Sequence, residues 1–164
     1  MIKISVKDKE ALRFLTELQR RSTNMTPVMR RIAEIMHDAV EENFEAEGRP
    51  RWRPLAASTI MGAFGGARKW NTKKGAVRKS IAKKLAGRKI LQDSGQLAAS
   101  ISRKSDARSA RVGTNKVYAA IHQFGGKAGR GRKVTIPARP FLKLTDSDIE
   151  EIKEAIKEYL KPHQ

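Results

Sequence analysis

The stretch YAAIHQFGGKAGRGRKVTIPARPFL, residues 118–142, places a basic segment between two apolar ones. The first apolar segment ends in a Gly-Gly pair, which permits a sharp turn because glycine has no Cβ atom. The second contains Pro137 and Pro140, which fix the backbone and direct Phe141 and Leu142 toward a core. We therefore expect two packed anchors, YAAIHQFGG and IPARPFL, that hold a flexible basic loop, KAGRGRK, between them.

The glycines and lysines of this stretch do not form a known catalytic motif. GGKAGRGRKV lacks the order GxxxxGK[ST] of a P-loop, and no GxGxxG unit is present. His122 has no nucleophile motif such as GxSxG beside it, so we expect a structural histidine. His37 and His163 show no metal-ligand spacing. The sequence therefore predicts no enzyme, no cofactor, and no catalytic or metal-binding residue.

Helical periodicity is clearest at the two ends of the chain. Apolar residues recur at helical spacing from Ala11 to about Arg21, after Asp8 as a candidate N-cap, and again from Thr26 to Phe44. Gly48 is expected to end the second helix, whose methionine stripe favours a core or a subunit contact. A last helix carries Ile149, Ile152, Ile156 and Leu160 on one face, with Asp146 or Ser147 as its cap.

Shorter elements are expected between these helices. IKISV (2–6), VTI (134–136) and the two halves of ISRKSDARSARVGTN (101–115) have the composition of strands. Short helical segments are expected at 58–64 and in VYAAIHQFGG. The predicted fold class is α+β: two N-terminal helices and a C-terminal helix packed on a small antiparallel sheet, with long basic loops.

Length and composition indicate one soluble domain over residues 1–164 without a membrane partner. The chain has 164 residues, no cysteine, and no apolar run near the roughly 18 residues that a membrane span needs. Its formal net charge is +18, and the charge is uneven. Residues 48–145 contain 24 Lys or Arg but only two acids, Asp93 and Asp106. Such a segment favours a polyanion or an acidic protein surface as neighbour.

Residues 62–88 are expected to form a basic insertion with partial flexibility. Val77, Ile81 and Leu85 permit an amphipathic helix, but the surrounding lysines and arginines repel one another. The whole basic region could neutralise DNA phosphates without reading sequence. A basic, sequence-independent nucleic-acid-binding protein is therefore one functional hypothesis.

The expected interaction residues are one aromatic side chain and eight cations. Trp52, between prolines, is suited to fill a pocket in its own core or in a neighbour's. Arg139, in a rigid segment, suits a salt bridge within the fold or a subunit contact. The set comprises Trp52, Lys73, Arg78, Lys83, Lys127, Arg130, Arg132, Lys133 and Arg139.

Four blocks of sequence, in order, resemble one protein family. They are FEAEGRPRWRPLAASTI (44–60), KILQDSGQLAASI (89–101), VGTNKVYAAIHQFGG (112–126) and IPARPFLKLTDSDIEEI (136–152). Together they are similar to the virion morphogenesis, or tail-completion, proteins of Mu-like and P2-like phages. The basic stretch between Gly62 and Arg88 departs from that pattern, because it is longer and more basic than the expected connection.

The resemblance implies a non-enzymatic structural protein that acts in tail completion and head–tail joining. It implies a homo-oligomer, with a hexameric ring as one form, at the head-proximal end of the tail. The implied partners are the tail tube and head-connector proteins, together with non-specific contact to DNA. Assembly would take place in the cytoplasm of a bacterial host, and the gene would belong to a phage or a prophage.

Overall fold

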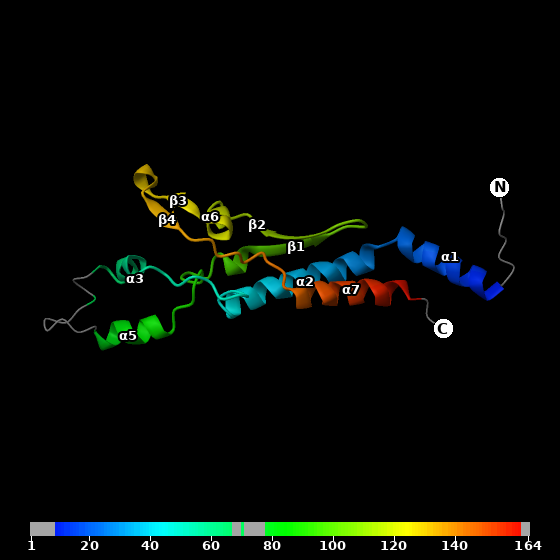
Figure 1. Ribbon diagram of the computed structural model, residues 1–164, viewed down its shortest axis with the longest axis horizontal. Coiled ribbons are helices and arrows are strands. Elements are labelled where there is room, and N and C mark those ends of the chain that lie inside the picture. Colours follow the sequence, from blue (N-terminus) through cyan, green and yellow to red (C-terminus); the bar gives the residue numbers. More distant parts are fainter. Residues whose placement is uncertain (1–8, 67–69, 71–77, 162–164) are drawn as a thin grey trace. The chain divides into compact units, whose positions relative to one another are not determined.

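A computed structural model describes residues 9–66, 70 and 78–161 (Figure 1). Within this part the protein combines helices with two small two-stranded antiparallel sheets, β1–β2 and β3–β4. The predicted α+β class is confirmed, with two sheets in place of one. The expected strand at 2–6, the cap Asp8 and the interaction residue Lys73 lie outside the described residues.

The described chain divides into two compact units. The first contains residues up to Val40, then Ile101–Gly113, and the chain from Leu144 onward. The second contains Glu41–Ser100 and Thr114–Lys143. The single domain over 1–164 and the flexible insertion at 62–88 stay predictions, and we describe each unit by itself.

The first unit is built from helices and one hairpin. Helix α1 covers Lys9–Thr23, α2 covers Thr26–Glu45, of which the part up to Val40 belongs here, and α7 covers Asp146–Leu160. Strands β1 (Ile101–Ser105) and β2 (Ala110–Thr114) form the predicted hairpin. The buried apolar face of α2 repeats at helical spacing, as expected, and consists of Val28, Ile32, Ala33, Ile35, Ala39 and Val40.

Helix α1 packs against α7, and hydrogen bonds connect the two helices. The Nη1 atom of Arg21 donates hydrogen bonds to the carbonyl oxygens of Tyr159 and Lys161, each at 2.7 Å. These carbonyls lie at the end of α7, where helix carbonyls lack partners and the helix dipole favours a cation. Glu17 holds Arg21 from the other side at 2.8 Å.

The N-terminus of α7 corrects the expected cap. Thr145, rather than Asp146 or Ser147, is the N-cap residue. Its side chain accepts a hydrogen bond from the N–H of Asp148, whose carboxylate accepts one from the N–H of Thr145. This reciprocal capping box satisfies two donors at once, which a cap at the next residue would not do.

The second unit contains the short elements. They are helix α3 (Ala57–Ala63), helix α5 (Lys79–Ala86), the 3₁₀ turn η1 (Ala98–Ser100), helix α6 (Ala119–Phe124), strand β3 (Gly126–Ala128), the 3₁₀ turn η2 (Arg130–Arg132) and strand β4 (Val134–Ile136). Gly48 follows the end of α2, as expected, with a φ of 101°. Its N–H donates to the carbonyl oxygen of Asn43 at 2.7 Å, which closes the helix end.

The two apolar anchors of residues 118–142 pack together, as predicted. The Oε1 atom of Gln123 accepts hydrogen bonds from the N–H groups of Phe141 and Leu142, both at 3.0 Å. Phe141 has no exposed surface. Gly125, between α6 and β3, has a φ of 72°, and a Cβ atom there would lie 2.7 Å from the backbone nitrogen of Ala138. The close approach of these two segments therefore requires glycine.

The segment between the anchors is not the flexible loop that was expected. Residues 126–128 pair with 134–136 as an antiparallel hairpin, with Ala128 opposite Val134 and Gly126 opposite Ile136 (Figure 1). Glycines 129 and 131, both with positive φ, form its turn. Backbone pairing with VTI outweighs the low strand propensity of Gly, Lys and Ala.

No helix in the described ranges has both the length and the apolar character that crossing a membrane demands.

Candidate functional site

The structure separates the predicted interaction residues into three groups, all in the second unit. Trp52 and Arg139 are buried, with 5% and 4% of their surface exposed. Arg78 is the N-cap residue of α5 and Lys83 lies within that helix; both are exposed. Lys127, Arg130, Arg132 and Lys133 are exposed on the β3–β4 hairpin.

Trp52 fills a pocket in the core of its own unit. Its ring meets Phe44 edge to face with centroids 5.9 Å apart, and Phe44 lies 5.5 Å from Phe141. The Nε1–H group donates to the carbonyl oxygen of Pro140 at 3.3 Å. A buried tryptophan with its polar atom satisfied stabilises the fold. Of the two alternatives for Trp52, the protein's own core is the one observed.

Arg139 is also held inside the unit, but by carbonyl oxygens rather than a carboxylate. Its Nε atom donates to the carbonyl of Arg53 at 3.0 Å, and its Nη2 atom to that of Pro54 at 3.1 Å. The guanidinium thus joins the segment of Arg53 and Pro54 to IPARPFL. These carbonyls take the place of the carboxylate that a salt bridge, one of the two alternatives for Arg139, would have required. Burial lowers the pKa of Arg139 from its ordinary value.

His122 lies beside Arg139 in the anchor. Its carbonyl oxygen accepts from the N–H of Arg139 at 2.7 Å, and its ring meets Tyr118 edge to face. Within the described residues its buried Nδ1 atom has no hydrogen-bond partner. Burial first, and the nearby charge of Arg139 second, lower the pKa of His122 from its ordinary value of 6.5. Both effects favour the neutral form of the ring.

The β3–β4 hairpin and its base form a surface that is both cationic and apolar. We call it the hairpin surface, and define it by Lys127, Arg130, Arg132, Lys133, Phe124 and Val134. Phe124 is 78% exposed and Val134 58% exposed, which is unusual for side chains of this kind. The sequence contains no Asp or Glu between Ala107 and Thr145 that could neutralise the cations from within this segment. Such a surface suits a partner that is acidic and partly apolar.

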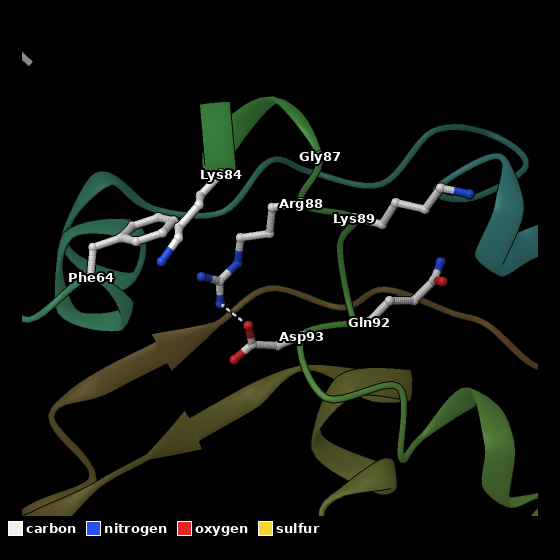
Figure 2. Close-up of a pocket in the computed structure, with 7 residues that line it drawn as sticks. All are labelled: Phe64, Lys84, Gly87, Arg88, Lys89, Gln92 and Asp93. Atoms are coloured by element: carbon white, nitrogen blue, oxygen red, sulfur yellow. Dashed lines mark ion pairs between the residues drawn. The ribbon is translucent and has the colours of Figure 1, made fainter. Parts of the chain in front are cut away.

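A second candidate site is a pocket beside α5, with a volume of about 350 Å³ (Figure 2). Its lining consists of Phe64, Lys84, Gly87, Arg88, Lys89, Gln92 and Asp93. Arg88 and Asp93 form an ion pair, Nη2 to Oδ1, at 2.9 Å. The guanidinium carbon of Arg88 lies 5.7 Å from the centre of the Phe64 ring, within the range of a cation–π contact. We call this the Arg88 pocket.

The chemistry of the Arg88 pocket favours binding an anion. It presents three cations, one amide and one carboxylate, and among the described residues its lining contains no hydroxyl or histidine that could act as nucleophile or general base. Elsewhere, on α2, His37, Asp38 and Glu41 bring potential ligand atoms within 4.8 Å of one another. Both of those carboxylates are exposed, and such groups are common on helix surfaces without a metal.

The sequence model of the phage virion morphogenesis family matches residues 6–161 of the chain. The chain belongs to this family. The match extends across the long helices and both candidate surfaces. The four sequence blocks indicated the same family, and that prediction is confirmed.

One prophage protein and one phage protein are similar in sequence to this family member. "Mu-like prophage FluMu G protein 2" of Haemophilus influenzae is 41% identical over 160 residues, which cover 97% of this chain and 96% of the relative. "Putative capsid assembly protein G" of Escherichia phage Mu is 41% identical over 69 residues, 42% of this chain and 44% of the relative. No solved structure matches.

Sequence reasoning missed the Arg88 pocket in this family member. None of the residues that line the pocket was among the expected interaction residues. The basic density of residues 78–89 was the signal available. Phe64 and Arg88 are 24 positions apart in the sequence, and a helical or strand periodicity does not predict a contact between them.

Proposed function

We propose that this protein is a structural virion morphogenesis protein that completes the phage tail and joins it to the head. The observation that carries the proposal is the family match over residues 6–161, together with the four ordered blocks that resemble tail-completion proteins. It would act without catalysing a reaction, as an oligomeric ring at the head-proximal end of the tail. Complementary surfaces, rather than a reaction centre, would perform the work.

The partners proposed are further copies of this chain, the tail tube protein and the head-connector proteins. The hairpin surface supports this proposal, because exposed Phe124 and Val134 beside four cations are suited to a protein contact. A partner that carries carboxylates around an apolar patch would cover both kinds of side chain. The ring and the position in the virion follow from the resemblance.

Electron microscopy of particles from a phage or prophage whose gene is deleted tests the proposal. We expect complete heads and complete tails that fail to join, and joining should return when purified protein is added. Normal infectious particles would contradict any essential role. Loss of heads would instead favour a role in capsid assembly, the function in the name of the phage Mu relative.

Mass measurement of the purified protein, with and without tail tube protein, tests the assembly state. A ring predicts a multiple of the 18.4 kDa chain, and addition of tail tube protein should produce a heavier complex. A monomer under both conditions would contradict the ring and the tail partner together.

A second candidate function is sequence-independent binding of nucleic acid. It is favoured by the 24 Lys or Arg against two acids in residues 48–145. This function predicts a DNA affinity whose logarithm falls linearly with the logarithm of salt concentration. Absence of binding at about 50 mM salt would exclude it.

A further inference from the structure

Arg88 has an incomplete set of hydrogen-bond partners inside its pocket. One end of its guanidinium pairs with Asp93. Its Nε–H group is buried and has no acceptor in the part of the chain that the structure describes. Buried donors in folded proteins almost always have an acceptor, because an unpaired one costs about 1–3 kcal/mol. An acceptor from outside the described residues would satisfy it.

The guanidinium of Arg88 is fixed in place for such an acceptor. Its guanidinium carbon lies over the Phe64 ring, Asp93 pairs with its end, and only 14% of the Arg88 side chain is exposed (Figure 2). An arginine whose planar donors are already oriented loses little conformational entropy on binding an oxyanion. The position therefore has the character of a built site rather than of a mobile surface charge.

The charge around Arg88 selects an anion. Asp93 balances one cation, which leaves the charges of Lys84 and Lys89 on the same pocket. Both lysines are exposed, so each can approach a ligand without leaving a partner recorded in the structure. A phosphate group carries several oxygens that can accept charge-assisted hydrogen bonds from a guanidinium or an ammonium group.

We propose that the Arg88 pocket binds a phosphate of the DNA backbone. Residues 78–89 contain six cations and no acid, and most of these cations are exposed along or beside α5. DNA presents a continuous line of negative charge, about one per 1.7 Å of duplex, which such a row can follow. An acidic protein surface also carries lysines and arginines between its carboxylates. Those cations would repel the row of cations in residues 78–89. The inference goes beyond tail completion. It rests on the second candidate function, sequence-independent binding of nucleic acid, and names the residues that would contact the backbone.

The first test compares two double variants of the full-length protein. Lys84→Ala with Lys89→Ala removes two pocket cations, and Lys104→Ala with Arg108→Ala removes two equally exposed cations of the β1–β2 hairpin. Binding of a fluorescent duplex of random sequence is followed by anisotropy between about 50 and 200 mM salt. The pocket variant should lose about tenfold in affinity and about two units of salt slope, and the control should stay near wild type.

The second test keeps the charge and changes the geometry. Arg88→Lys retains the cation but lacks the Nε–H group, and it should weaken DNA binding about fivefold while the melting temperature stays close to wild type. A folded Arg88→Lys protein with wild-type affinity would overturn the proposal. So would equal losses in the two double variants, or no DNA binding by the wild type.

Competition separates DNA phosphate from protein carboxylate. Inorganic tripolyphosphate should displace the duplex from the wild type more effectively than polyglutamate does at equal concentration of negative charge. Stronger displacement by polyglutamate would assign the pocket to an acidic protein and overturn the DNA assignment. Failure of head–tail joining in the deletion strain is a separate readout, so the two proposals can fail independently.

Discussion

Asn43 is a fully buried polar side chain, and its hydrogen bonds join two distant segments of the second unit. Its Nδ2 atom donates to the carbonyl oxygens of Phe141 at 2.9 Å and Lys143 at 2.7 Å. Its Oδ1 atom accepts from the Nε atom of Arg49 at 3.0 Å. We expect Asn43→Ala to lower the free energy of unfolding by about 3 kcal/mol, because the buried carbonyl of Phe141 and two partly buried groups lose their hydrogen bonds. Urea denaturation measures the change.

The control for Asn43 is Asn115→Ala, at an exposed position in the same unit. It should change the free energy of unfolding by less than about 0.5 kcal/mol. Equal effects of the two substitutions would show that the buried bonds of Asn43 contribute nothing particular.

His122 should make stability depend on pH in a defined direction. Its pKa in the folded protein lies below 6.5, so the unfolded chain binds the proton more readily. Stability is therefore complete above the unfolded pKa and falls as the pH drops through 6.5 toward the lower folded value. Thermal unfolding between about pH 7.5 and 5.5 measures this loss.

The His122→Gln variant removes the titrating group while it keeps a polar side chain of similar length. We expect its stability to change less than that of the wild type over the same pH range. Parallel curves for the wild type and the His122→Gln variant would contradict the role given to burial and to Arg139.

At the scale of the element, the cap of α7 rests on the pair Thr145 and Asp148. We expect Thr145→Ala to lower the free energy of unfolding by about 1 kcal/mol, because the Asp148 N–H loses its acceptor. Thr145→Ser keeps the hydroxyl and should remain near wild type. Chemical denaturation measures the free energy of unfolding of the wild type and both variants. An alanine variant as stable as the wild type would contradict the capping box.

The sequence predicted the elements whose signals are local and periodic. All the signals for the α2 helix, from Pro27 in its first turn to Gly48 beyond its end, lie within 23 consecutive positions. The signals for the β1–β2 hairpin are equally local. The β3 strand was missed because GKA has no strand propensity of its own and pairs only with VTI across a turn. The cap of α7 was misplaced because Asp146 and Ser147 are equally good cap residues by type.

The candidate site was predictable in its charge but not in its geometry. The basic character of the hairpin and of α5 follows directly from composition. The burial of Arg139 against the carbonyls of Arg53 and Pro54 does not, because 85 or more residues separate the partners. Contacts of that kind depend on tertiary packing, and a hydrophobic pattern carries no information about them.

At the scale of the whole molecule, the hairpin surface should be required for assembly but not for folding. We expect Arg130→Ala with Lys133→Ala to leave the melting temperature unchanged, because both side chains are exposed. The yield of joined particles in a complementation assay should fall more than about tenfold, because the charge complementarity of the contact is lost.

The matched control is Lys104→Ala with Arg108→Ala, which also removes one lysine and one arginine from an exposed hairpin. It should support normal particle yield. If both variants lose the same yield, total charge rather than the hairpin surface governs assembly. If neither does, the contact to the tail or head proteins lies elsewhere.

The hairpin also offers a position from which docking can be observed directly. Its turn lies beyond the last backbone pair, Ala128 with Val134, and its cations are exposed. None of the 164 residues is a cysteine, so Thr135→Cys, at an exposed position near the turn and outside the hairpin-surface residues, would introduce a single thiol. A fluorophore attached there would report in real time when the protein reaches a tail tube, and a photo-reactive group would mark the chain that it touches.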